Sequence, residues 1–318
     1  MSFSSKHQGG GGLDELRRLN NLRGRLAIEN LRIDAIVQPK GANMKEKQHL
    51  QSLELRWIED VKLEEITEAV AEGYEMQLEG LQPHPNLKDL GVCWKPFQQT
   101  ILSVSDGGAR PINVQPSSSS STSSYYPPLC KLMSLAIHSI HDLQFLPDEL
   151  KSLTSLKDME IGNCQELKSL YPGIQHLTLL QNLRIVNCKK LDMSADEAHA
   201  ITMWQQPLKR LQTLFFVGLP QLVDLPSGLQ HLTGLQTLRI AACENLESLP
   251  RWIKSFTFLQ RLDLENCPKL ASLPEEITSL TSLHTLMIGG CDTLKPRSEG
   301  EKGEDWPKIF NIPDLRIY

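Results

Sequence analysis

The sequence is poor in aromatic residues and has no long apolar run. Phe, Trp and Tyr make up 6% of its 318 residues, so any core has to be built mainly from aliphatic side chains. No stretch approaches the roughly 18 consecutive apolar residues that a membrane-spanning helix needs. The amino terminus also lacks the apolar segment of a secretory signal.

Markers of secreted proteins are missing as well. No asparagine stands in an Asn-x-Ser/Thr sequon, and the seven cysteines are an odd number without the CxxC spacing of a zinc site. We therefore expect a cytoplasmic, intracellular protein whose thiols stay reduced. The formal net charge of -5 is small for this length and gives no reason to expect a nucleic-acid partner.

The sequence shows no set of catalytic residues. Residues 196–199 spell Asp-Glu-Ala-His, as in a helicase family, but the GxxxxGK[ST] phosphate loop that such a motor needs is absent. We find no nucleophile with a base and an orienting group. The expectation is a protein that is not an enzyme, with no catalytic residues, no cofactor and no metal site.

What the sequence does contain is an internal repeat with the pattern LxxLxxLxIxxC. Its period of about 24 residues lies within the range of the leucine-rich-repeat template. The period is constant except for one longer step, from Leu177 to Leu208. Seven copies in register match the template. They begin at Leu129, Leu153, Leu177, Leu208, Leu232, Phe256 and Leu280.

Each copy predicts one short strand, because the two apolar residues of its L-x-I triplet point to the same face. Stacked copies predict a parallel sheet with strands about 4.8 Å apart and one continuous core. An LPxxL-like motif recurs between the strands at 146–150, 170–174, 225–229, 249–253 and 273–277. Because proline does not fit a central ladder, this motif belongs to the convex return. The predicted fold class is α/β: a leucine-rich-repeat solenoid, or horseshoe, with a parallel β-sheet on the concave face and irregular or short-helical convex segments.

The repeat divides the chain into five parts. We expect a flexible segment at 1–12, irregular repeats at 13–103, a Ser/Pro/Gly-rich loop at 104–128, about seven regular repeats at 129–296, and a C-terminal cap at 297–318. The irregular part should hold strands centred near Ala27, Glu54 and Gly91, with a convex helix at 61–80. In the cap, we expect a last edge strand at 315–317 and a cover over the open core made by Trp306, Ile309, Phe310 and Ile312.

One column of the repeat carries cysteine. A metal ladder or disulfides would be one interpretation, and buried free thiols the other. Ile140 and Leu219 fill the same column in two copies, which favours burial. The cysteines of this column are Cys164, Cys188, Cys243, Cys267 and Cys291.

The concave face is the surface that the pattern offers to a partner. The residue between the two apolar positions of each strand points there, and a flanking column adds further side chains. Arg and aromatic residues are enriched at binding hot spots, although ordinary solvated strand residues remain the alternative. The candidate partner-binding residues are Asp158, Glu160, Arg184, Phe215, Arg239, Arg261, Asp263 and Met287.

Three stretches resemble a known family, the plant intracellular nucleotide-binding leucine-rich-repeat disease resistance proteins of the coiled-coil type. They are 12–31 (GLDELRRLNNLRGRLAIENL), 41–57 (GANMKEKQHLQSLELRW) and 291–318, with the element GEDWPKI. The resemblance extends over the leucine-rich-repeat region only, without the coiled-coil and nucleotide-binding domains. It implies a protein partner, either a pathogen effector or a host protein, and contact with the nucleotide-binding domain in a full receptor.

Two other functions also use this repeat. A substrate-recognition repeat protein of a ubiquitin ligase would need an F-box-like helical segment ahead of the repeats, and only about twenty residues precede the first expected strand. A secreted receptor ectodomain would carry a GxIP pattern, where this chain has LPxxI. Both are therefore less favoured than an immune-receptor repeat region.

Overall fold

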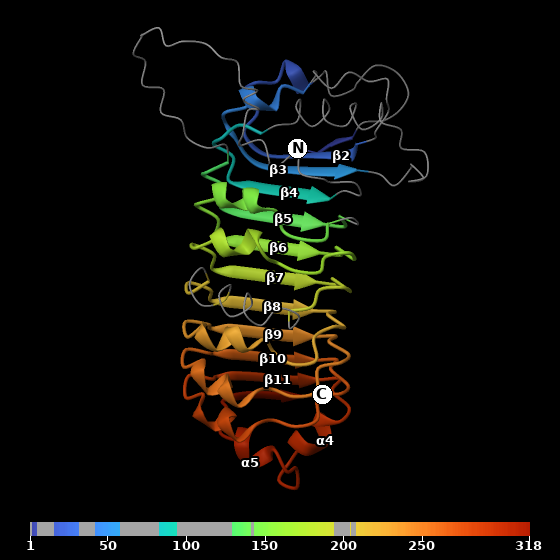
Figure 1. Ribbon diagram of the computed structural model, residues 1–318, viewed down its shortest axis with the longest axis vertical. Helices are drawn as coiled ribbons and strands as arrows, with labels where there is room; N and C mark the ends of the chain where they lie inside the picture. Colours follow the sequence, from blue (N-terminus) through green and yellow to red (C-terminus); the bar gives the residue numbers. More distant parts are fainter. Residues whose placement is uncertain are drawn as a thin grey trace.

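A computed structural model describes residues 2–4, 16–31, 42–57, 83–93, 129–140, 143–193, 204 and 208–318. Its strands form one parallel sheet of twelve strands, β1 to β12, in which spatial order follows chain order. Figure 1 shows the strands stacked one above the other, with the N-terminal strands at one end and the C-terminal helices at the other. The solenoid fold is therefore confirmed.

The N-terminal strands are β1 (Ser2–Ser4), β2 (Gly24–Leu31), β3 (Leu50–Trp57) and β4 (Asp89–Cys93). The strands that follow are β5 (Ser134–His138), β6 (Asp158–Gly162), β7 (Asn182–Val186), β8 (Thr213–Val217), β9 (Thr237–Ala241), β10 (Arg261–Glu265), β11 (Thr285–Gly289) and β12 (Asp314–Ile317).

The apolar triplets of β5 to β11 build the core, as their alternation predicts. Every one of these side chains, from Leu135 and Ile137 in β5 to Leu286 and Ile288 in β11, is at most 3% exposed. The first triplet position pairs leucine with leucine from β7 to β11, for example Leu214 with Leu238. One strand could not bury this face alone, so each repeat depends on its neighbours.

The convex return segments contain short 3-10 helices, each introduced by the proline of the LPxx motif. They are η4 (Asp148–Ser152), η5 (Gly173–His176), η6 (Ser227–His231), η7 (Arg251–Ser255) and η8 (Glu275–Ser279), preceded by Pro147, Pro172, Pro226, Pro250 and Pro274. Proline suits this place because its missing N–H would have no partner at a helix start. Figure 1 shows the helices along one side of the stack.

The one longer repeat, between β7 and β8, does not disturb the sheet. Strand β8 pairs with β7 in the ordinary register, with Arg184 opposite Phe215. Trp204, which lies between these strands in the chain, is fully buried. Residues 196–199 and the expected helix at 61–80 lie outside the described residues, as do the loop residues 104–128.

The irregular strands lie where the sequence places them. Ala27 is paired with Glu54, and Glu54 with Gly91. Strand β1 differs from the expectation of a flexible segment at 1–12, because Ser2–Ser4 pairs with β2. The buried Lys47 donates hydrogen bonds to the carbonyls of Leu16 and Leu19 at this end of the stack. Burial lowers the pKa of Lys47.

The C-terminal cap consists of α4 (Leu294–Ser298), α5 (Trp306–Ile309) and β12, which pairs with β11. Ile309 is fully buried, and Ile312 packs partly buried against the core. Trp306 is half-buried. The prediction for Phe310 is wrong, since its side chain is 53% exposed. It directly follows Ile309, and consecutive residues in a helical turn point about 100° apart, so both cannot face the core.

Candidate functional site

The parallel register places the candidate residues in rows across the concave face. In the central row Glu160 lies beside Arg184, Arg184 beside Phe215, and Phe215 beside Arg239. The row continues through Asp263 to Met287. Alternation along each strand points these side chains away from the core. The strand pattern alone therefore predicts that they share one face of the sheet.

The centre of this face carries a stacked pair. The guanidinium carbon of Arg184 lies 4.8 Å from the centroid of the Phe215 ring, within the range of a cation–π contact. Phe215 is only partly buried, although its neighbour Phe216 is fully buried in the core. A partly exposed aromatic ring in contact with an arginine combines two residue classes, aromatic and Arg, that are enriched at binding hot spots.

A hollow of about 510 Å³ lies on the same face, over strands β5 to β9. One wall comes from Asp158 and Glu160 of β6, and the other from Arg184 and Phe215. The rest of the lining comes from the core residues Leu135 and Met159 and from the small or polar residues Ser134, Ala136, Asn182, Thr213 and Thr237. The hollow therefore joins four of the eight candidate residues in one concavity.

The acidic wall is contacted by the side chains of Asn182 and His138. Asn182 donates a hydrogen bond to Asp158 at 2.5 Å. Glu160 lies 3.7 Å from the His138 ring nitrogen, and that ring lies over Gly162, where a side chain would collide with it. The carboxylates are thus positioned without being neutralised by Lys or Arg.

The charges further along the face are paired with each other. Arg239 contacts Glu265 at 3.0 Å, and Arg261 contacts Asp263 at 2.9 Å. Arg261 also donates to the Met287 sulfur at 2.9 Å. These interactions leave little free charge over β9 and β10.

Asp263 does not offer the accessible carboxylate that the sequence suggests. The residue is 2% exposed, because the side chain of Arg261 from the same strand lies against it. One carboxylate oxygen of Asp263 and the Arg239 Nε are buried without a hydrogen-bond partner among the described residues. Alternation alone could not show this, because it sets which face a side chain is on and not what covers it.

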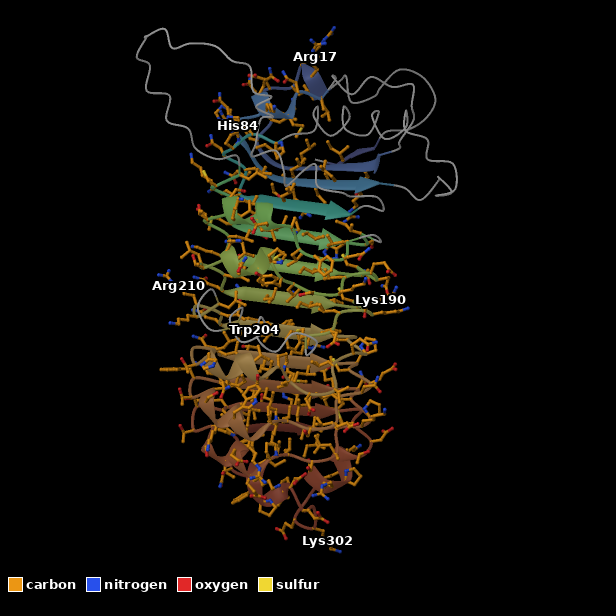
Figure 2. All side chains as sticks on the ribbon, in the orientation of Figure 1. Arg17, His84, Lys190, Trp204, Arg210 and Lys302 are labelled. Carbon is orange, nitrogen blue, oxygen red and sulfur yellow. The ribbon has the colours of Figure 1, made fainter. Side chains whose placement is uncertain are left out.

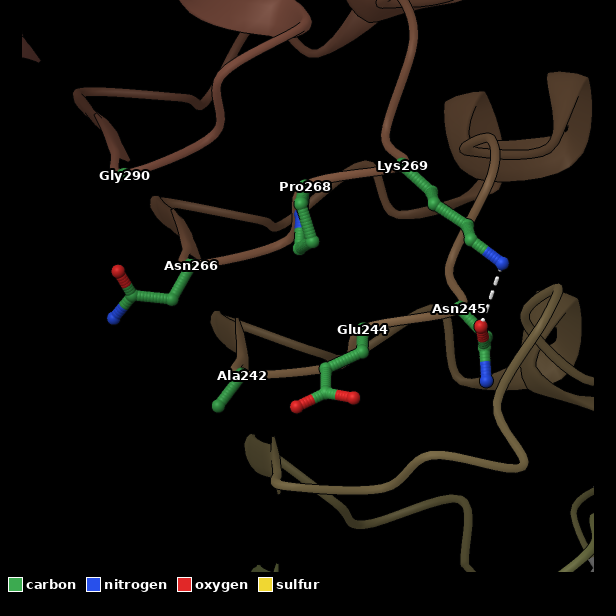
Figure 3. Close-up of a pocket in the computed structure, with 7 residues that line it drawn as sticks. All are labelled: Ala242, Glu244, Asn245, Asn266, Pro268, Lys269 and Gly290. Carbon is green, nitrogen blue, oxygen red and sulfur yellow. Dashed lines mark hydrogen bonds between the residues drawn. The ribbon is translucent and has the colours of Figure 1, made fainter.

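A second hollow of about 610 Å³ lies beside the carboxyl ends of β9 to β11. Figure 3 shows its lining, in which Lys269 bonds Asn245; Asn245 in turn donates to the Pro220 carbonyl. The backbone amides of Ala242, Asn266 and Gly290 in its lining already donate to neighbouring carbonyls. The concave hollow, with its free charges, is the better candidate for recognition.

The cysteine column consists of buried thiols, as predicted. All five are fully buried, and all described cysteines are free. The thiols donate to carbonyls at the strand ends, as Cys164 does to Gly162 at 3.5 Å. Burial raises the pKa of Cys243 to about 11. The column therefore serves packing and turn formation.

Charged side chains also lie at the ends and edges of the stack. Figure 2 shows Arg17 and Lys302 at opposite ends, and Arg210 and Lys190 at the two lateral edges. In the described ranges, no group of three or more His, Cys, Asp or Glu side chains is arranged to hold a metal ion. No helix in those ranges has the length and apolar character to cross a membrane.

Comparison with protein families gives two matches. The family described as R13L1/DRL21 LRRs matches residues 13–103. The family described as Plant disease resistance protein RPS2-like, leucine-rich repeats, matches residues 130–268. No curated protein matches the chain.

Three of the solved structures that match this chain have low sequence identity to it. The leucine-rich repeat domain of the type III effector XCV3220 (XopL) is 18% identical, covers 87% of this chain and 71% of its own, and has a TM-score of 0.44. Listeria monocytogenes InlP is 13% identical, with coverages of 89% and 62% and a TM-score of 0.40. The PEPR1–AtPEP1 structure is 14% identical, with coverages of 91% and 37% and a TM-score of 0.43.

Both family matches are to leucine-rich repeats, and both fall on the parts of the chain that form the parallel ladder. The chain is a leucine-rich-repeat protein.

Proposed function

We propose that this chain is the protein-interaction module of a plant disease resistance receptor, acting in innate immunity. It recognises a pathogen effector or a host protein through its concave face. In a full receptor it also restrains the nucleotide-binding domain. The observation that carries this proposal is the hollow over β5–β9, where Arg184 stacks on Phe215 opposite two carboxylates.

The family matches support the receptor class. The longer of the two, over residues 130–268, is to leucine-rich repeats of plant disease resistance proteins, and it includes every strand that lines the hollow. The free thiols of the cysteine column suit an intracellular location, where thiols stay reduced.

Binding of a macromolecule, and not catalysis, agrees with the chemistry of the hollow. It is an open concavity on a sheet, and its charged groups are spread over neighbouring strands. A catalytic site needs a nucleophile or base held beside an orienting group, and the hollow's lining offers no such set. Extended concave surfaces of this kind are what solenoids use to bind other chains.

The test is a binding assay with a panel of candidate pathogen effectors and host proteins. The triple variant Arg184→Ala, Phe215→Ala, Arg239→Ala should lose binding of the cognate partner by about tenfold or more, as expected for hot-spot residues. Thermal unfolding of the same preparations verifies that the fold is retained.

A matched control removes two arginines and one phenylalanine elsewhere. Arg210, Arg251 and Phe258 are all exposed and lie outside the concave columns. Their triple alanine variant should bind the partner as the unmodified chain does. Equal affinity of the concave variant and the unmodified chain would refute recognition through this face.

A further inference from the structure

In the concave hollow the two carboxylates of β6 lie apart from the guanidinium of Arg184. This arrangement of charge favours one class of ligand. Building on the proposed function, we infer that the hollow binds an extended segment of the partner protein in which a basic and an acidic side chain are separated by one residue. The basic side chain lies against Asp158 and Glu160, and the acidic side chain lies against Arg184.

Among the described residues, the acidic wall has no Lys or Arg partner. Asp158 accepts a hydrogen bond only from the neutral Asn182 amide. Glu160 has the His138 ring nitrogen at 3.7 Å, and no Lys or Arg of the described residues forms an ion pair with it. Two carboxylates from one strand therefore face the hollow with their charge uncompensated by Lys or Arg, which favours a cation there.

The basic wall is equally unpaired. Arg184 is the register partner of Glu160, so an ion pair between them would be easy to form, yet none is present. The guanidinium instead stacks on Phe215, and no carboxylate of the described residues lies within ion-pair distance of it. A stacked guanidinium keeps its in-plane N–H groups available for a bidentate contact with a carboxylate.

The separation of the two walls fits an extended chain. The carboxylates belong to β6, while Arg184 of β7 leans towards β8, so the two charges are between one and two strand spacings apart, about 5–10 Å. Alternate residues of an extended segment lie on one side at intervals of about 6.7 Å. A segment that runs along the stack therefore presents residues i and i+2 to the two walls, with the residue between them turned to solvent.

The rest of the lining suits such a segment. Ala136 leaves space beside the acidic wall, where the aliphatic stem of a lysine or arginine can lie while its charge reaches a carboxylate. The hydroxyls of Thr213 and Thr237 border the other side and can bond a backbone passing over them.

The neighbouring strands show why the hollow is distinct. Arg239 and Arg261 have Glu265 and Asp263 as partners, so binding an outside charge there would first require breaking an existing pair. The charges of Arg184, Asp158 and Glu160 are available without that cost.

The experiment uses the purified full chain and end-capped fluorescent heptapeptides Gly-Ser-X-Ser-Z-Ser-Gly, with binding followed by anisotropy at low salt. The pairs at X and Z are Lys/Glu, Glu/Lys, Lys/Lys, Glu/Glu and Ser/Ser. We expect one of the two mixed peptides, Lys/Glu or Glu/Lys, to bind at least about tenfold more tightly than the Lys/Lys, Glu/Glu and Ser/Ser peptides. This binding should weaken as added salt screens the charges.

Neutral variants then assign each charge to its wall. Arg184→Gln should remove the preference for glutamate, so that the mixed and Lys/Lys peptides bind alike. Asp158→Asn together with Glu160→Gln should remove the preference for lysine, so that the mixed and Glu/Glu peptides bind alike. Arg210→Gln, at the lateral edge, should change none of these affinities.

The outcomes separate this inference from the proposed function. Equal affinities for all five peptides, or an unchanged ranking in Arg184→Gln, would overturn the ligand class. If the peptides fail in this way while a partner protein still loses binding in the concave triple variant, the receptor function stands without the ligand assignment. If the partner is unaffected by the triple variant, the concave site itself is wrong.

Discussion

Asp305 and Lys308 together bind both backbone groups of one residue in the neighbouring return segment. The Lys308 ammonium donates to Asp305 Oδ1 at 2.8 Å and to the Leu273 carbonyl at 2.7 Å. Asp305 Oδ2 accepts the Leu273 amide at 3.1 Å. This pair joins α5 to the return segment between β10 and η8, in the copy that begins at Phe256.

We expect Asp305→Asn to destabilise the cap strongly. Asp305 is fully buried, and removal of one member of a buried ion pair costs about 3–5 kcal/mol. Hydrogen exchange of residues 294–318 measures the local effect. Glu304→Gln is the control, because Glu304 pairs with Arg297 on the surface with 73% of its side chain exposed, and such pairs contribute less than about 1 kcal/mol. Equal loss of protection in both variants would contradict the role of Asp305.

The same carboxyl should make the cap sensitive to acid. Burial alone would raise the pKa of Asp305, but hydrogen bonds from Lys308, the Leu273 amide and Arg297 outweigh it and hold the pKa below its ordinary value. Its contribution is therefore complete above the unfolded-state pKa of about 3.9 and is lost as the pH falls through the lower folded value. Hydrogen exchange of the cap at pH 6 and below pH 4 should show this loss in the unmodified chain, and little further loss in Asp305→Asn.

Ala242 offers a stabilising substitution. It follows β9 with φ of 50°, a left-handed conformation that costs alanine about 1–2 kcal/mol. Asn163, Asn187 and Asn266 hold the equivalent position in other repeats with the same sign of φ, and Asn187 donates to Asn163 at 3.2 Å. Ala242→Asn should raise the free energy of unfolding by about 0.5–1 kcal/mol, since asparagine tolerates this conformation.

The variant Ala242→Val tests the same position in the opposite direction. A β-branched residue is a poor fit for positive φ, so the midpoints of urea unfolding should fall in the order Asn, Ala, Val. The reverse order would show that backbone strain does not govern this turn.

Gly173 and Gly234 form a second matched pair. A Cβ at Gly173 would lie 2.6 Å from the Pro147 carbonyl oxygen and 2.8 Å from two leucine side-chain carbons. At Gly234 the nearest atom would be 3.7 Å away. We expect Gly173→Ala to destabilise by about 1–3 kcal/mol through overpacking, and Gly234→Ala to be neutral or slightly stabilising. Thermal unfolding of the two variants makes the comparison, and similar midpoints would count against tight packing between η4 and η5.

The repeat pattern predicts the rows of the sheet well because each L-x-I triplet has to bury two side chains. Once Leu183/Ile185 and Leu214/Phe216 point inwards, the neighbours Arg184 and Phe215 have to lie together on the other face. The pattern holds even across the longer repeat, because β7 and β8 pair in the ordinary register.

Contacts between surface side chains could not be predicted in the same way. The burial of Asp263 depends on Arg261 bending back along its own strand, and the orientation of Arg184 depends on competition between Glu160 and Phe215. Strand β1 is not predicted from the sequence, because the three residues Ser2–Ser4 are too few for alternation to be recognised; its position depends on pairing with β2. Phe310 was misplaced because composition alone does not distinguish it from its neighbour Ile309.

The unbroken ladder between β7 and β8 also has a consequence for how such a chain diversifies. The longer repeat and the repeats of ordinary length meet their neighbours in the same register. Whole repeats can therefore be duplicated, deleted or exchanged between related genes while the leucines of each repeat stay buried in the same positions of the core. Each such exchange would bring a new set of side chains beside Arg184 and Phe215, so recombination changes the surface of the concave face without rebuilding the fold.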